Sequence, residues 1–138
     1  MGTRADFYVG RGLGAKWLGS IAWDGYEVSD EILKAKTEAD FNTALAAFLG
    51  GREDATYPKN GWPWPWEDSN TTDYSYAFDD GRTWITSFGH GWFKTFKALN
   101  AAAEKSGGNG PKVVFPNMKT DKYAKPNDPR SGIMMLGG

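Results

Sequence analysis

Hydrophobic and polar positions alternate with a period of two near the start of the chain and again past its middle. Residues 6–9 and 16–23 form two alternating segments that are separated by a glycine-rich turn. Residues 74–78 and 82–88 repeat this arrangement around Asp79-Asp80-Gly81. Asp-Gly between two alternating segments is a strong signal for a β-hairpin. The pattern therefore predicts two hairpins.

Three other stretches have the three- and four-residue spacing of helices. One follows Thr37, with Asp40 placed as in a capping box, and its apolar stripe ends at Gly50-Gly51. A shorter helix is predicted from Ser29. The last is predicted to begin directly after Gly91, with five residues on one side: Trp92, Phe93, Phe96, Leu99 and Ala103.

The end of the chain predicts one more strand and a tail. Residues 112–115 are β-branched or aromatic after Lys112, and prolines and scattered basic residues follow from Pro116. We expect a single α+β domain over residues 1–115. It has an antiparallel sheet built from the two hairpins plus the C-terminal strand, with two or three helices on one face. Residues 116–138 are expected to form an extended or flexible tail.

The composition excludes several kinds of site. The chain has 138 residues, no cysteine, one histidine and a net charge of -1. Disulfides, thiolate chemistry and the usual zinc sites are therefore excluded, and no metal or other cofactor is expected. The balance of 16 basic and 17 acidic residues argues against a duplex-DNA partner. No apolar run approaches the roughly 18 residues of a membrane helix, so no membrane partner is expected.

The most unusual segment alternates tryptophan with proline. Trp62, Trp64 and Trp66 are separated by single prolines, which exclude a helix interior and a central strand. A stiff, extended backbone would let exposed indoles stack on a base, a sugar or a partner protein with little loss of entropy. Alternatively, the tryptophans fold back as a lid over the sheet. Both interpretations stay open at this stage.

A second candidate site is the segment Gly89-His90-Gly91, where a strand is expected to end and a helix to begin. Unpaired amides and the positive end of the helix dipole would face this junction. Arg82 on the preceding strand and Lys94 on the helix could complete a cradle for a phosphate. The alternative is that His90 is an ordinary loop residue and that the lysine is solvated.

The glycines at positions 10, 12 and 14 invite comparison with a nucleotide-binding loop. The dinucleotide fingerprint needs a helix directly afterwards, because the amides at its N-terminus hold the pyrophosphate. Here a strand is expected to follow, so a glycine-rich hairpin turn is the better interpretation. Arg11 beside these glycines could still contact an anion.

Residues 3–12 (TRADFYVGRG) and 17–26 (WLGSIAWDGY) resemble the opening of small uncharacterised proteins from bacteriophages and prophages. The likeness covers the first 26 residues and carries no motif with a known catalytic role. It implies a phage accessory protein in the cytoplasm of the bacterial host. By analogy, such proteins often counter host defence, either by sequestering a nucleotide signal or by binding a defence protein directly.

These observations favour a binding protein over an enzyme. The leading hypothesis is the capture of a nucleotide-like ligand, with a base stacked on the tryptophans and a phosphate held near His90. Its candidate residues are Trp62, Trp64, Trp66, Arg82, His90, Lys94 and Arg11. A homo-oligomer is a candidate assembly, because a domain of this size offers only a shallow cleft. The alternatives are an anti-CRISPR-like inhibitor that binds a host defence protein and, third, a small hydrolase that uses His90 or a pair of carboxylates.

Overall fold

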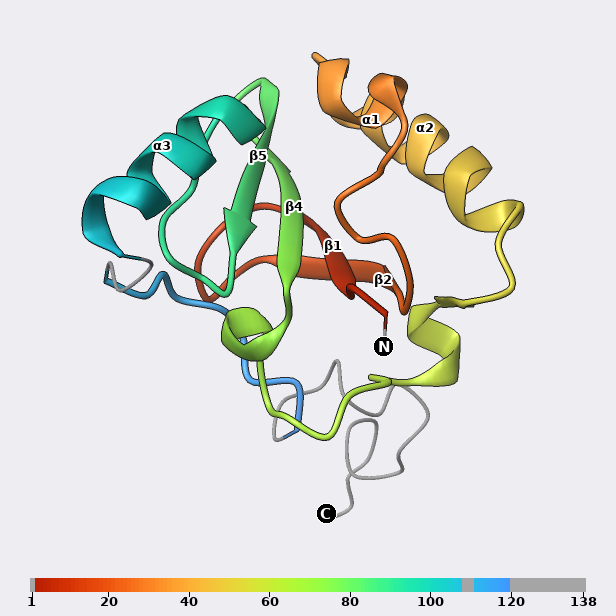
Figure 1. Cartoon of the computed structure of the whole chain (residues 1–138). Helices are drawn as coiled ribbons and strands as arrows, with labels where there is room; N and C mark the ends of the chain where they lie inside the picture. Colours follow the sequence, from red (N-terminus) through yellow and green to blue (C-terminus); the bar gives the residue numbers. More distant parts are fainter. Residues whose placement is uncertain (1, 108–110, 120–138) are drawn as a thin grey trace.

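The computed structural model describes residues 2–107 and 111–119, and it confirms a single α+β fold. One five-stranded sheet carries three α-helices and two 3₁₀ helices (Figure 1). The elements in chain order are β1 (Ala5–Val9), β2 (Lys16–Ile21), α1 (Asp30–Lys34), α2 (Glu38–Gly50), β3 (Ala55–Thr56), η1 (Pro58–Asn60), η2 (Ser69–Thr71), β4 (Tyr74–Asp79), β5 (Arg82–Ser87) and α3 (Phe96–Ser106).

Both predicted hairpins are confirmed, but the sheet that they form is mixed rather than antiparallel. The strand order is β3-β2-β1-β4-β5, and the two hairpins meet where β1 and β4 pair in parallel. Ala5 lies opposite Tyr74 at one end of this pairing, and Val9 lies opposite Phe78 at the other. A parallel pair needs a long crossover, and the chain between the hairpins supplies it with α1, α2 and the tryptophan–proline segment.

The predicted strand at residues 112–115 is wrong, because this segment has no regular secondary structure. The Val113 amide donates one hydrogen bond to the carbonyl oxygen of Gly89, at 2.7 Å. The prolines at positions 111 and 116 have no N–H with which to extend a ladder on either side. The fifth strand of the sheet is instead the short β3, which pairs with β2.

One face of the sheet packs against all three helices, as predicted. Phe41, Leu45 and Leu49 of α2 are buried in the same core as alternate residues of β1 and β4. The predicted cap of α2 is confirmed, since the Thr37 hydroxyl accepts a hydrogen bond from the Asp40 amide at 3.1 Å. Twelve buried residues make up this core: Ala5, Phe7, Ile21, Ile32, Ala35, Phe41, Leu45, Leu49, Tyr76, Phe78, Ile85 and Leu99.

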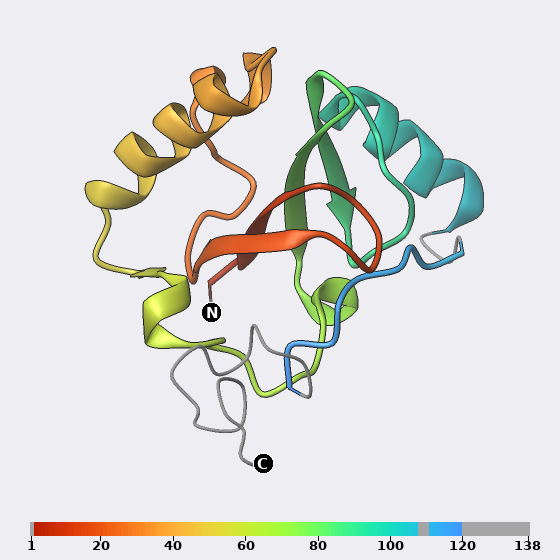
Figure 2. The ribbon, with the colours of Figure 1, turned by 180° about the vertical axis from the view of Figure 1, so that it is seen from behind.

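The opposite face of the sheet is covered by the tryptophan–proline segment, by η2 and by residues 111–119, none of which contains an α-helix or a strand. The 111–119 segment runs past η2 (Figure 2), and its Phe115 and Met118 belong to a second core around Tyr8 and Trp17. Pro116 and Met118 are buried, although they belong to the predicted tail, and the Met118 amide donates to the Glu67 carbonyl at 2.6 Å. Residues 120–138 of that tail lie outside the described residues.

Candidate functional site

The seven predicted ligand-binding residues lie in three separate places on the fold. Three of them belong to the tryptophan–proline segment on the face opposite the helices. Three cations gather around an indole that the sequence analysis did not select. The last lines a pocket between β5 and α3. In this order they are Trp62, Trp64 and Trp66; Arg11, Arg82 and Lys94; and His90.

The three indoles of the tryptophan–proline segment are fastened to the protein by their own N–H groups. Trp64 Nε1 donates to Asp6 Oδ1 at 2.7 Å, and Trp66 Nε1 donates to Thr72 Oγ1 at 3.0 Å. Trp62 Nε1 donates to the carbonyl oxygen of Trp66 at 2.7 Å, and Trp62 also packs edge-on against Trp17. The contacts are those of a lid that folds back over the sheet, which is the alternative interpretation of the sequence.

Beneath this lid lies Asp6, a carboxylate with no exposed surface. Its Oδ1 accepts from the Ser20 hydroxyl at 2.5 Å as well as from Trp64, and its Oδ2 accepts from the Ser69 hydroxyl at 2.6 Å. The Tyr8 hydroxyl lies 2.7 Å from the same Ser69 oxygen. Burial raises the pKa of Asp6, and the hydrogen bonds from its polar neighbours oppose this shift only in part.

This raised pKa predicts an unusual dependence of stability on pH. Between the unfolded-state value of 3.8 and the higher native pKa of Asp6, the native protein binds more protons than the unfolded chain. The contribution of Asp6 is therefore fully present below pH 3.8 and is lost as pH rises through the native pKa. We expect wild type to lose unfolding free energy relative to Asp6→Asn as the pH rises through this range. Urea titrations of both proteins at a series of pH values measure it, and parallel pH profiles would contradict the expectation.

The cation cluster surrounds Trp84 on β5. The guanidinium carbon of Arg11 lies 4.0 Å from the centroid of this indole, that of Arg82 lies 5.8 Å away, and Lys94 Nζ lies 5.9 Å away. These three residues come from the β1–β2 turn, from the start of β5 and from the segment before α3. Trp84 Nε1 donates to the Asp79 carbonyl at 2.8 Å, which fixes the orientation of the ring.

The charges of the cluster are only partly balanced. Arg11 Nε forms an ion pair with Asp79 Oδ2 at 3.0 Å. In the described part of the chain, neither Arg82 nor Lys94 forms an ion pair with a carboxylate, and the buried Nε of Arg82 has no hydrogen-bond partner there. An arginine stacked on an indole, with two further cations beside it, can hold a flat molecule that carries negative charge.

His90 does not lie at the start of a helix, so the predicted cradle is wrong in this respect. The helix α3 begins at Phe96, and the hydroxyl of Thr95 caps it by accepting from the Ala98 amide at 3.0 Å. Phe93, which was expected inside the helix, pairs with Ile85 in an isolated antiparallel bridge. The positive end of the helix dipole is therefore several residues beyond the Gly89-His90-Gly91 loop.

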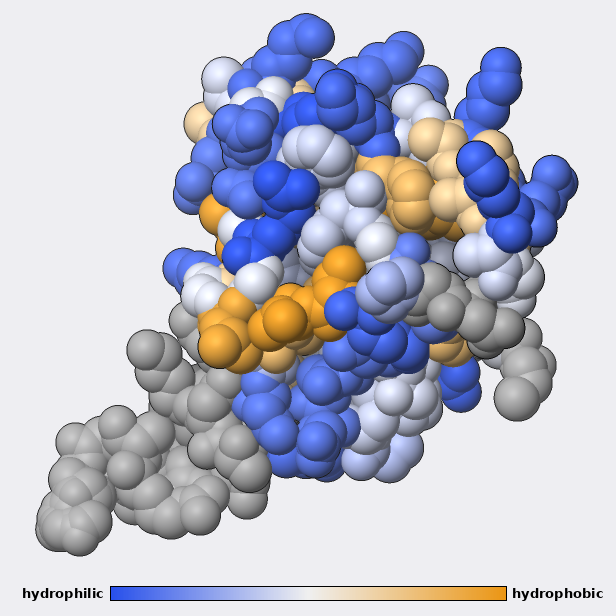
Figure 3. All heavy atoms as spheres, turned by 90° about the vertical axis from the view of Figure 1, so that its left-hand side faces the viewer, coloured by the Kyte–Doolittle hydropathy of each residue, from blue (hydrophilic) through white to orange (hydrophobic). Residues whose placement is uncertain are grey.

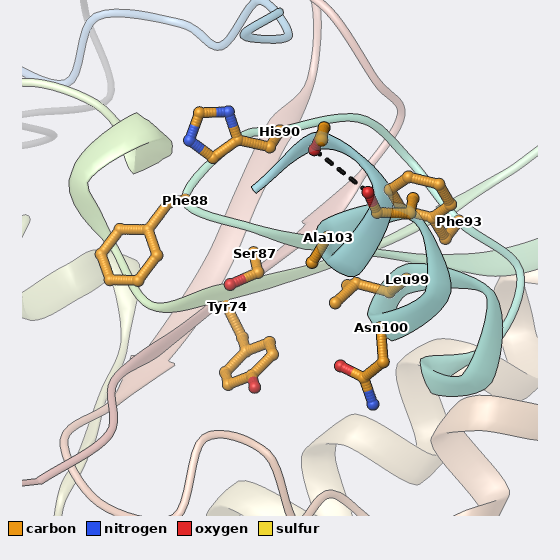
Figure 4. A pocket seen from close by; sticks show the side chains of 10 residues that line it. Tyr74, Ser87, Phe88, His90, Phe93, Leu99, Asn100 and Ala103 are labelled. Atoms are coloured by element: carbon orange, nitrogen blue, oxygen red, sulfur yellow. Dashed lines mark hydrogen bonds between the residues drawn. The ribbon is translucent and has the colours of Figure 1, made fainter. Parts of the chain in front are cut away.

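His90 instead lines a pocket of about 230 Å³ between β5 and α3 (Figure 4). Its ring lies at one edge of the pocket, beyond Phe88, while Leu99 and Ala103 form the opposite wall on the helix. The face of the molecule that carries α3 also shows a band of apolar side chains between hydrophilic regions (Figure 3).

The described part of the chain holds no candidate metal site and no candidate membrane segment. Residues 2–107 and 111–119 contain no group of three histidine or acidic side chains placed to hold a metal ion. Within the same ranges, no helix has both the length and the apolar character needed to cross a membrane. No family model, no curated protein and no solved structure matches this chain. The resemblance to phage proteins therefore stays a prediction.

Proposed function

We propose that this chain is a non-enzymatic binding protein that captures a nucleotide-like ligand at the Trp84 cluster. The observation that carries the proposal is the convergence of Arg11, Arg82 and Lys94 on one indole, with two of the three cations lacking a carboxylate partner in the described part of the chain. Three cations and one carboxylate leave a local positive charge, although the whole chain carries a net charge of -1.

The geometry supports different roles for the residues of the cluster: some would stack on a base and others would hold a phosphate. The guanidinium plane of Arg11 and the indole of Trp84 offer stacking surfaces for a base, since arginine planes and aromatic rings both stack on nucleobases. Arg82 and Lys94 lie 5.8 Å and 5.9 Å from the centroid of the same ring, where they can hold a phosphate. Hydrogen bonds to charged groups contribute roughly 1.5–3 kcal/mol each, which is enough to make the phosphate a requirement for tight binding.

This proposal keeps the ligand class that the sequence suggests but replaces its stacking residues. Trp62, Trp64 and Trp66 fasten the lid over Asp6, and Trp84 takes the stacking role. In the phage setting that the N-terminal resemblance implies, capture of this kind would withdraw a nucleotide signal from host defence.

A second candidate function is the direct binding of a host protein, and one observation favours it. Trp23 and Tyr26, in the segment after β2, are 52% and 49% exposed. Tryptophan and tyrosine are the side chains that most often anchor protein interfaces. Aromatic side chains of this size, exposed over about half of their surface, would serve a protein partner better than a small ligand.

Nucleotide titrations followed by thermal unfolding test the leading proposal. We expect AMP, ADP or a cyclic dinucleotide to raise the melting temperature at low salt, since a ligand at a hundred times its dissociation constant stabilises a fold by about 2.7 kcal/mol. Lys94→Ala and Arg82→Ala should each weaken the affinity about tenfold, because each removes one charged contact. The affinity of wild type should also fall as salt is added, since the cations are partly exposed.

Lys59→Ala is the matched control, because it removes one exposed positive charge from η1, on the β2 side of the sheet. Its nucleotide affinity should equal that of wild type. Inorganic phosphate alone should bind more weakly than any nucleotide, because it cannot stack. Absence of any nucleotide effect at millimolar concentration would overturn the proposal. Capture of a host protein that is lost on Trp23→Ala would then support the second candidate.

A further inference from the structure

The pocket between β5 and α3 has the composition of a binding site for a small ring. Three of its lining residues are aromatic, namely Tyr74 on β4 and Phe88 and Phe93 in the segment between β5 and α3, and Leu99 and Ala103 line it from α3 (Figure 4). Small-molecule sites are typically concave and lined by aromatic and aliphatic side chains, with a few polar groups that fix the orientation of the ligand. This pocket follows the same pattern.

The polar side chains of the pocket belong to tyrosine, serine, asparagine and histidine. Its lining contains no aspartate, glutamate, lysine or arginine, and its polar residues are Tyr74, Ser87, His90, Asn100 and Ser106. Burial raises the pKa of Tyr74, with smaller contributions from Asp73 and Tyr26, so its hydroxyl stays protonated at neutral pH. A charged ligand would lose its hydration here, and the lining has no carboxylate, lysine or arginine to compensate for that loss, which favours a neutral ligand.

The volume of the pocket sets the size of its ligand. At about 230 Å³ it lies below the roughly 300–1,000 Å³ of sites for drug-sized molecules. It exceeds the roughly 150 Å³ of a protein cavity that binds benzene. We propose that this pocket is a second binding site, which takes one neutral heteroaromatic molecule of one or two rings with a hydrogen-bonding edge, such as a free nucleobase or an aromatic amide.

The second site is separate from the Trp84 cluster. Successive side chains of a strand point to opposite faces of the sheet. Ile85 belongs to the core on the helix side, where Phe93 also packs, whereas Trp84 lies opposite Ala77 of the other core. The two sites therefore open on different faces and select different charges, so the second site does not depend on the proposed capture of nucleotides.

Amide and methyl NMR spectra of the full chain test the second site with adenine and nicotinamide as probes. We expect both neutral rings to shift the signals of residues around the pocket, those of Phe88 and Ala103 above all. Ala103→Leu should weaken this binding at least tenfold, because the longer side chain fills the pocket. Leucine is nearly as favourable as alanine in a helix, so the variant should fold. Ala101→Leu, on the same helix but outside the lining, should bind like wild type.

Two further probes distinguish the possible occupants. Benzoate, which carries a charge, should not shift these signals. Shifts caused by N-acetyl-tryptophanamide and by neither free ring would overturn the proposal in favour of an aromatic anchor from a partner protein. No shift with any probe at millimolar concentration would also overturn it. Loss of adenine binding in Ala103→Leu, with nucleotide stabilisation unchanged, separates this site from the Trp84 cluster.

Discussion

Replacing Asp6 with alanine is expected to lower the free energy of unfolding by about 4 kcal/mol. The substitution leaves the buried hydroxyls of Ser20 and Ser69 and the N–H of Trp64 without their acceptor. Each donor that loses its partner costs roughly 1–3 kcal/mol. The expected loss corresponds to a fall of about 15 °C in melting temperature for a domain of this size. Calorimetry at neutral pH measures it.

Ser75→Ala provides a matched control for this prediction. Ser75 lies beside Asp6 in the parallel pairing of β1 and β4, and it is also fully buried. Its hydroxyl has no hydrogen-bond partner among the described residues, so its removal should cost less than about 1 kcal/mol. Equal losses for Asp6→Ala and Ser75→Ala would show that the carboxylate does not hold the lid. A large loss for Asp6→Ala alone would confirm that the contacts of Asp6 account for it.

The Asp6 network explains why local sequence patterns could not identify the role of the tryptophans. The partners of Asp6 lie 14, 58 and 63 residues away along the chain, at Ser20, Trp64 and Ser69. Nothing in the alternation of residues 6–9 distinguishes a buried aspartate from one on an exposed strand face. The available signal was the position of Asp6 between apolar residues, in a strand that is covered on both faces.

The elements that were predicted correctly depend on local signals. The cap at Thr37, the stripe of α2 and the turn at Asp79-Asp80-Gly81 each involve residues a few positions apart. The parallel pairing of β1 with β4 joins residues about seventy positions apart, and it depends on how the crossover packs. Two hairpins can pair through different edge strands, and the choice of strands decides whether the joined sheet is mixed or antiparallel. The pattern within each hairpin does not determine this choice.

The predicted start of α3 is wrong because an extended segment and the helix that follows it share one apolar pattern. Trp92 and Phe93 continue the apolar stripe of the helix backwards, yet Phe93 is extended and pairs with Ile85. Thr95 carried the correct signal, since threonine is a good N-cap and its hydroxyl performs this role. The Trp84 cluster was missed for a different reason: Arg11 reaches the indole from another hairpin.

Gly89→Ala is expected to lower the free energy of unfolding by about 3 kcal/mol through two separate effects. Gly89 has a φ of +70°, a conformation that costs other residues roughly 1–2 kcal/mol. An added Cβ would also lie 1.8 Å from Asn70 Oδ1. Asn70 cannot simply turn away, because its Nδ2 donates to the Val113 carbonyl at 3.1 Å and holds the 111–119 segment. The sequence suggested an anion site at Gly89. In the structure, the close approach of Asn70 is the reason why this position needs a glycine.

Gly81→Ala isolates the backbone effect from the steric one, and thermal unfolding of both variants measures the difference. Gly81 has a φ of +76°, nearly that of Gly89, but an added Cβ there would meet no atom of the described residues within 4 Å. Its substitution should therefore cost only about 1 kcal/mol, the penalty of the left-handed conformation. The surplus in Gly89→Ala then reports how firmly Asn70 joins η2 to the 111–119 segment. Equal losses in the two variants would mean that Asn70 moves aside without cost, and that the two segments are held on the sheet by their own packing.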